Sequence, residues 1–105
     1  MLSKADREFL EKAMPYLGVR AVAVDYSLST AKYPDIWVNL EKNPPLITVT
    51  ETWRRKNATQ RRVELVHELL HIQGIQHGKI GSWDFNTKPE LDSYSAAVYQ
   101  QIVRR

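Results

Sequence analysis

The chain has 105 residues, 43% of them hydrophobic, a formal net charge of +3 and no cysteine. A chain of this length can form one domain with one modest core, so we expect residues 1–105 to be a single domain; the absence of cysteine excludes disulfides and thiolate metal sites. Charges are spread through the N-terminal stretch MLSKADREFLEKAM. This stretch predicts neither a secretory signal nor a membrane span and favours a cytoplasmic protein.

The first predicted element is a helix. Ser3 followed three residues later by Asp6 is typical of a helix start, and Pro15 with Gly18 is expected to end the helix. The apolar residues between them fall on one helical face. They are Phe9, Leu10, Ala13, Met14 and Leu17.

Three strands are predicted to follow. Residues 19–26 are rich in valine and apolar on both faces, which indicates a buried strand. A second strand is expected at residues 35–40. The segment 41–45 contains two prolines and is expected to turn the chain into a third strand, residues 46–52. Together these segments predict a small three-stranded sheet.

A second long helix is predicted between Asn57 and Gly74. Asn57 with Gln60 resembles a capping box, and glycine is typical of a helix end. The stretch HELLHIQGIQH, residues 67–77, starts within this predicted helix and contains all three histidines of the chain. The histidines therefore mark this helix as the place to look for a function.

The spacing of the histidines is that of metal ligands. His67 and His71 are four residues apart, so a helix places both imidazoles on one face, one turn apart. Gly74 lets the chain leave the helix and turn His77 toward the same point, which gives the three ligands that catalytic zinc requires. Glu68 lies beside them, where it can take a proton from bound water. We expect one Zn²⁺ per chain on the three histidines, with Glu68 as general base.

Chance is the alternative explanation for a pair of histidines at this spacing. A single histidine on an apolar helix face is more often a core residue than a ligand. The full pattern HExxHxxGxxH fixes five positions and is far more restrictive. It therefore favours a zinc site.

These five positions resemble the signature of the zincin metallopeptidases. The three-histidine form is typical of metzincins, but those have a methionine-containing turn after the motif, whereas Met1 and Met14 both precede it here. In length and element order the chain is more similar to the minigluzincins, minimal soluble gluzincin-like peptidases. The resemblance implies a single minimal catalytic domain of the α+β class, with an N-terminal helix, a three-stranded sheet, the motif helix and a C-terminal helix. It also implies a zymogen held latent by its C-terminal segment.

A last helix is predicted over residues 87–103. In gluzincins the corresponding helix carries a glutamate ligand, so Glu90 or Asp92 is an alternative third ligand, or a partner for a histidine N–H. His77 is preferred, because imidazole is the commoner third ligand at this spacing. Tyr94 is a candidate for oxyanion stabilisation, although core packing is the more frequent role of such a tyrosine. The expected buried stripe is Leu91, Tyr94, Ser95, Val98 and Ile102.

The expected function is that of a zinc metalloendopeptidase acting on peptide or protein substrates. Zinc lowers the pKa of bound water to about 7 and polarises the scissile carbonyl, and Glu68 carries the proton to the leaving amine. A substrate is expected to add to an exposed strand edge, for which residues 46–52 are the candidate. We expect a monomer, or a dimer that exchanges its terminal helix, because such an exchange costs little.

Two other functions remain open. The endoribonucleases of ribosomal-RNA maturation also use three histidines with a glycine before the last, and the basic run of residues 54–62 would suit RNA. That family typically has glycine in place of Glu68, and an acid beside the metal repels phosphate. Nucleic acid is therefore the less favoured partner, and a run of this kind is more often a solvated face. The other alternative is a zinc protein without turnover. The basic residues are Arg54, Arg55, Lys56, Arg61 and Arg62.

Overall fold

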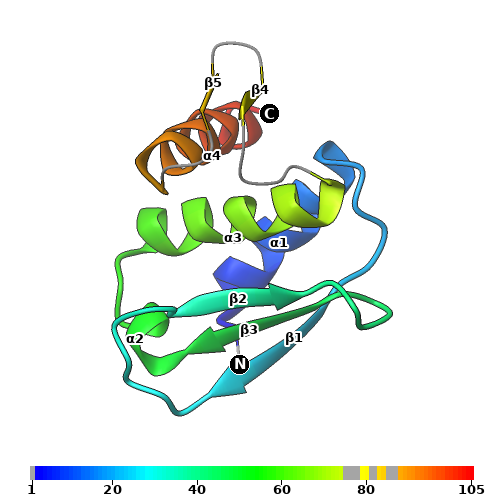
Figure 1. The fold of residues 1–105 in the computed structure, drawn as a ribbon. Helices are drawn as coiled ribbons and strands as arrows, with labels where there is room; N and C mark the ends of the chain where they lie inside the picture. Colours follow the sequence, from blue (N-terminus) through cyan, green and yellow to red (C-terminus); the bar gives the residue numbers. More distant parts are fainter. Residues whose placement is uncertain (1, 75–78, 81–82, 85–87) are drawn as a thin grey trace.

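A computed structural model describes the backbone of residues 2–74, 79–80, 83–84 and 88–105, and the side chains of residues 2–74 and 91–105. Within these ranges the helices gather on one face of a three-stranded sheet, and the long helix α3 lies between the sheet and helix α4 (Figure 1). The predicted α+β class and arrangement are therefore confirmed. None of the helices in the described ranges has the length and apolar character needed to cross a membrane.

Helix α1, Lys4–Tyr16, forms where the sequence predicts a helix. The Asp6 N–H donates a hydrogen bond to the Ser3 hydroxyl over 3.2 Å, which caps the first turn. Pro15 lies inside the last turn rather than beyond it, and Gly18 follows with a φ of 70°. This left-handed conformation favours glycine and turns the chain toward the sheet.

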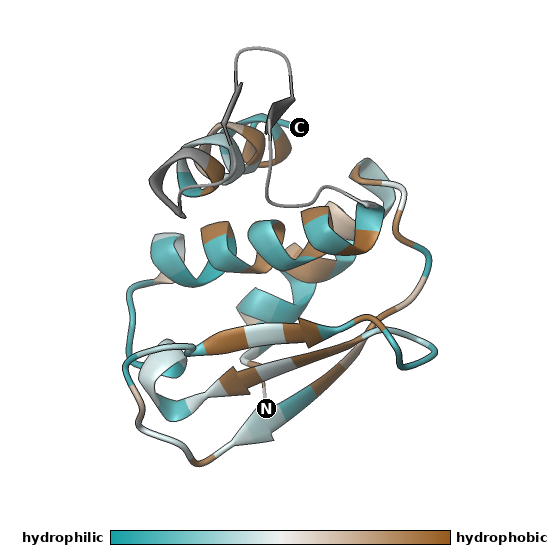
Figure 2. Cartoon of the chain, in the orientation of Figure 1, coloured by the Kyte–Doolittle hydropathy of each residue, from teal (hydrophilic) through white to brown (hydrophobic). Residues whose placement is uncertain are grey.

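The sheet consists of β1 (Ala23–Ser27), β2 (Ile36–Asn39) and β3 (Leu46–Thr50) in the order β1-β3-β2. β1 runs parallel to β3, and β2 runs antiparallel to it. Apolar and polar residues alternate along β2 and β3 (Figure 2), so that one face of the sheet packs against the helices. The prediction of a strand buried on both faces at residues 19–26 is wrong, because β1 is an edge strand that begins at Ala23 and remains partly exposed.

The prediction that residues 46–52 form an exposed strand edge for a substrate is also wrong. β3 pairs on both sides, so its backbone groups are already bound within the sheet. The strand ends at Thr50, whose hydroxyl accepts a hydrogen bond from the Trp53 N–H and caps a short helix, α2 (Glu51–Arg54). The edge strand that lies beside α3 is β2.

Helix α3, Ala58–Gln73, carries the histidine motif. The Asn57 side chain accepts a hydrogen bond from the Gln60 N–H at 2.9 Å, and Gly74 ends the helix with a φ of 110°, as the sequence predicts. Beyond it lie two short paired strands that the sequence analysis did not anticipate, β4 (Lys79–Ile80) and β5 (Trp83–Asp84).

Helix α4, Lys88–Val103, packs against α3. Its predicted stripe is buried except for Tyr94, which is partly exposed. In the core, this helix adds to a cluster that α1, β2, β3 and α3 build together. The largest fully buried apolar side chains are Trp53, Ile47, Leu65, Leu69, Leu70, Leu91 and Ile102.

The carboxylate of Asp6 ties α1 to α3. It is only 2% exposed and accepts hydrogen bonds from Arg61 Nε at 2.8 Å and Arg62 Nε at 3.2 Å. A buried carboxylate is tolerated only when it is paired and hydrogen-bonded, as it is here. We therefore treat Asp6 as a structural anchor of the motif helix.

We expect Asp6→Ala to lower the free energy of unfolding by about 2 to 4 kcal/mol, because two half-buried guanidinium groups lose their carboxylate. Urea unfolding measures this loss. The matched control is Glu8→Ala, an exposed change in the same helix, for which we expect less than about 0.5 kcal/mol. Equal losses in the two variants would contradict the anchoring role.

Candidate metal centre

The structure brings His67 and His71 together on one face of α3. Their Nε2 atoms are 3.0 Å apart, and the ring centroids are 4.8 Å apart. Two imidazoles on a tetrahedral zinc, with Zn–N bonds of about 2.0–2.1 Å, would place their nitrogens about 3.3–3.4 Å apart. At 3.0 Å the two nitrogens can share one proton or, with a small movement, a cation. The geometry therefore fits two ligands of one metal ion.

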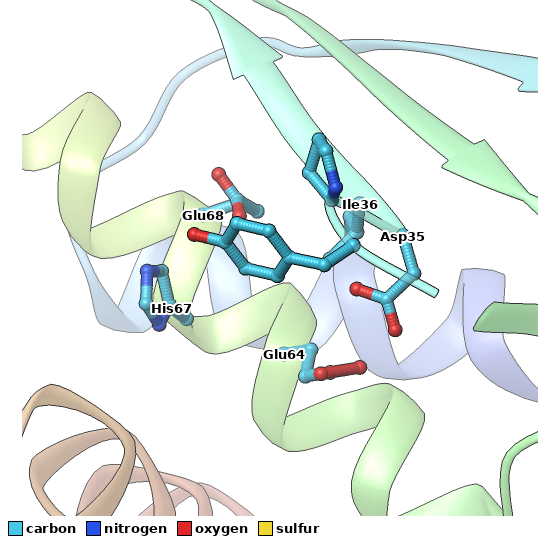
Figure 3. A pocket seen from close by; sticks show the side chains of 7 residues that line it. Asp35, Ile36, Glu64, His67 and Glu68 are labelled. Atoms are coloured by element: carbon cyan, nitrogen blue, oxygen red, sulfur yellow. The ribbon is translucent and has the colours of Figure 1, made fainter. Parts of the chain in front are cut away.

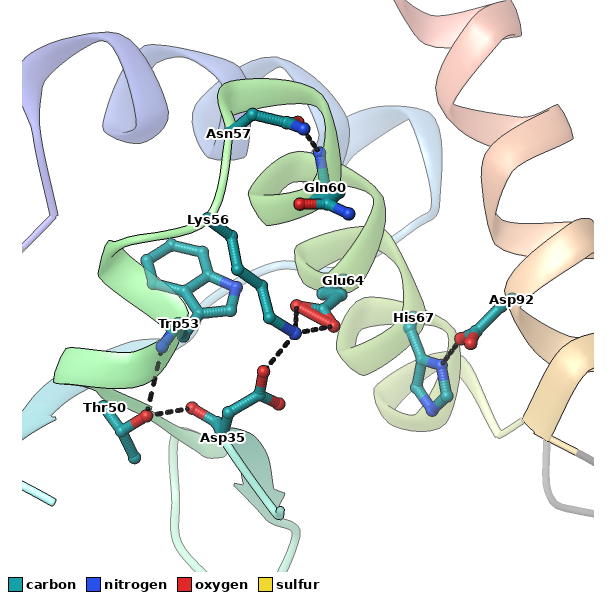
Figure 4. Close-up of polar contacts among 9 residues, drawn as sticks. All are labelled: Asp35, Thr50, Trp53, Lys56, Asn57, Gln60, Glu64, His67 and Asp92. Atoms are coloured by element: carbon teal, nitrogen blue, oxygen red, sulfur yellow. Dashed lines mark hydrogen bonds and ion pairs between the residues drawn. The ribbon is translucent and has the colours of Figure 1, made fainter. Parts of the chain in front are cut away.

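Asp92 of α4 lies at the other nitrogen of His67. The distance from His67 Nδ1 to Asp92 Oδ1 is 3.3 Å (Figure 4). A carboxylate accepts, so this contact favours the tautomer of His67 in which Nδ1 carries the hydrogen and Nε2, beside His71, is the nitrogen with the lone pair. This is the arrangement by which an outer carboxylate orients a metal-binding imidazole. Asp92 therefore contacts the ring nitrogen of His67 that does not face His71. This position suits a residue that orients His67.

Glu68 is the most buried acid of the motif helix, with 7% of its surface exposed. Together with His67 it lines a small pocket whose opposite wall is the segment 33–36, immediately before and within β2 (Figure 3). The pocket has a volume of about 90 Å³. This is enough for a few waters or one small side chain, and too little for a folded partner. Glu68 therefore lines a space that a small group can enter.

Lys56 joins the two walls of this pocket. Its Nζ contacts both carboxylate oxygens of Glu64 at 3.0 Å and forms an ion pair with Asp35 (Figure 4). The backbone carbonyl of Asp35 separately accepts hydrogen bonds from the N–H and the hydroxyl of Thr50, at 3.1 and 2.8 Å. Burial alone would lower the pKa of Lys56, but the hydrogen bonds that its ammonium group donates to Asp35 and Glu64 outweigh burial and raise this pKa above its usual value.

The rest of the basic run is also paired with acids. Arg54 and Arg55 form ion pairs with Glu51, at 3.6 and 3.4 Å, and Glu51 accepts a hydrogen bond from the Tyr26 hydroxyl. The Tyr26 hydroxyl, followed by the two arginines, lowers the pKa of Glu51 in spite of partial desolvation. Arg61 and Arg62 bind Asp6, as described above. The expectation of a solvated face holds for the well-exposed Arg54 and Arg55, whereas the other three are partly buried structural residues.

The remaining predicted site residues are placed only in part. His77 lies outside the described residues, and Glu90 lies in α4, with its side chain outside them. Tyr94 packs partly buried against the core. Within the residues that the structure describes, no group of three histidine, aspartate or glutamate side chains is arranged to hold a metal. The third ligand thus stays a prediction.

Sequence reasoning missed Asp35 and Glu64 as pocket residues. Glu64 lies one turn before the motif, and a carboxylate at that spacing from His67 and Glu68 could have been recognised as sharing their face. Asp35 carries no local signal, because it reaches the pocket only through the pairing of β2 with β3.

Comparison of the chain with protein-family models, with curated proteins and with solved structures found no match.

We expect the stabilisation that Lys56 provides to be lost at high pH. Its folded pKa is raised above the ordinary value of 10.5, so the contribution is complete below that pH and disappears as the pH rises through the folded pKa. The measurement is urea unfolding of wild type and Lys56→Met at pH 8 and pH 11; the difference between them should shrink at pH 11. Arg55→Met is the control, because arginine stays charged. A difference that is the same at both pH values would contradict this assignment.

Proposed function

We propose that the chain is a zinc-dependent metalloendopeptidase. The observation that carries the proposal is the convergence of His67 and His71 Nε2 beside the buried Glu68, with Asp92 on the outer nitrogen of His67. The five-position motif and the resemblance to minigluzincins support the same function. The third zinc ligand is the one part of this metal site for which the structure describes no side chain.

The donor set fits zinc. Neutral imidazole is among its preferred ligands, and we propose His67 and His71 with His77 as the third, or Glu90 in its place. When bound, zinc would supply a Lewis acid for the scissile carbonyl and a water with a pKa near 7. Asp92 would hold the ring of His67 in orientation through its Nδ1–H.

The protein's own groups would then do three things. Glu68 would take the proton of the attacking water and pass it to the leaving amine, which its burial beside the pocket favours. The pocket would receive one substrate side chain. An extended substrate would lie along β2, because this edge strand is next to α3, whereas β3 is fully paired.

Two parts of the proposal concern the C-terminal helix. Latency through the C-terminal segment and exchange of α4 between two chains both stay predictions. The structure describes α4 packed on α3 of the same chain, with Leu91 and Ile102 completely buried. The last turn of α4 is also held to α1, because the Tyr16 hydroxyl donates to Gln101 at 2.7 Å and Arg105 lies over the Tyr16 ring. Any truncation that tests latency must therefore spare Ile102.

The endoribonuclease alternative is weakened by the ion pairs of the basic run. Phosphate binding relies on cations whose charge is available to the nucleic acid. Here every cation of the run is paired with a carboxylate of the same chain. A zinc protein without turnover is the remaining alternative. Assays on an unstructured polypeptide and on single-stranded RNA, each with and without chelator, separate the three functions.

We expect the chain to bind one zinc ion. His71→Ala and His77→Ala should weaken binding sharply, and Asp92→Asn by about 10- to 100-fold, the usual loss for an outer-shell partner. Glu90→Ala should leave the affinity unchanged. Zinc titration and metal analysis measure these effects. If Glu90→Ala loses the metal and His77→Ala keeps it, the gluzincin-type ligand set is correct instead.

We expect Glu68→Gln to lower peptide hydrolysis by about 100- to 10,000-fold, which is the usual contribution of a general base. The amide has nearly the same size as the carboxylate, so the fold and the zinc content should not change. Circular dichroism and metal analysis provide those two controls. Full activity in this variant would exclude the proposed role of Glu68.

A further inference from the structure

The ammonium group of Lys56 links two segments that are distant in sequence. Asp35 precedes β2, and Glu64 lies on α3, one turn before His67 and Glu68. Both carboxylates line or adjoin the pocket, and each is largely buried, with 9% and 15% of its side chain exposed. The Lys56 bridge therefore joins the carboxylates of the two pocket walls (Figure 4).

Without this cation the two walls would repel each other. Asp35 and Glu64 contact the same nitrogen, so their oxygens lie within about 6 Å of each other, a separation at which two partly buried carboxylates disfavour each other strongly. Lys56 replaces that repulsion by two attractions. Its removal should therefore move the segment 33–36 away from α3, instead of leaving the wall in place.

Building on the proposed peptidase function, we propose that Lys56 is a positioning residue. By holding Asp35 and Glu64 together it fixes the width of the pocket that receives a substrate side chain beside the general base. Lys56 itself does not line this pocket, so it acts through the two carboxylates and does not touch the substrate there.

The fold does not depend on this bridge alone. The backbone carbonyl of Asp35 keeps its two hydrogen bonds from Thr50, and β2 keeps its pairing with β3 when Lys56 is replaced. Lys56→Met should therefore fold, with the change confined to the pocket wall. Lys56→Arg keeps the charge and should keep most of the bridge.

The kinetic experiment uses zinc-loaded full-length protein and an unstructured peptide series. For Lys56→Met we expect KM to rise about tenfold while kcat changes less than twofold, because the loss is one of substrate binding. Lys56→Arg should recover at least half of the effect on a logarithmic scale. The matched control is Arg55→Met, which removes the same charge from the neighbouring, 72% exposed position and should leave KM unchanged.

Hydrogen exchange tests the wall itself, without substrate or metal. The amides of Asp35 and Ile36 should exchange at least tenfold faster in Lys56→Met than in wild type or Arg55→Met. Faster exchange with an unchanged KM overturns the inference, because the bridge would then be structural only; unchanged exchange overturns it as well. A wild-type chain that binds zinc but hydrolyses no peptide contradicts the proposed function separately. In that case the exchange rates still test whether Lys56 holds the wall, and the effect of the wall on substrate binding is overturned together with the proposed function.

Discussion

The burial of one face of α3 is the constraint on which the rest of the structure depends. Leu65, Val66, Leu69 and Leu70 are each at most 1% exposed, and they contact the core that α1 and the sheet build. At about 100° per residue, this leaves His67 and His71 on the opposite side of the helix. The apolar face therefore decides where the imidazoles point before any metal is considered.

That side of α3 is covered by α4, and this makes the site possible. A histidine pair on an open helix surface would be solvated and free to rotate. Here the side chain of His67 is only 13% exposed, and Asp92 holds its Nδ1. The contact orients the ring and leaves Nε2 toward His71. The same packing that completes the core thus holds the Nε2 atoms of His67 and His71 3.0 Å apart, at the usual entropic cost of ordering side chains.

Local features of the sequence predict local structure well. The caps at Ser3, Asn57 and Gly74 all form, because each depends on residues within one turn of the cap. The prediction that His67 and His71 lie together on one helix face is correct for the same reason, because they are one turn apart. The errors concern long-range pairing. Nothing within residues 46–52 reveals that β3 has neighbours on both sides, and the alternation of its apolar residues hides the point at which Thr50 ends the strand by capping α2.

The pocket beside Glu68 could likewise be predicted only in part from the sequence. One wall is a face of α3 and follows from helical spacing, but the other reaches it through sheet pairing and the Lys56 bridge. The basic run is a similar case. Residues 54–62 contain no acid, yet each of their cations forms an ion pair with a carboxylate outside this range. A charge run in the sequence therefore does not define a charged surface. In this chain, Lys56, Arg61 and Arg62 hold α1, α3 and the segment before β2 together. This leaves the helix chemistry of His67, Glu68 and His71 as the feature that a function has to explain.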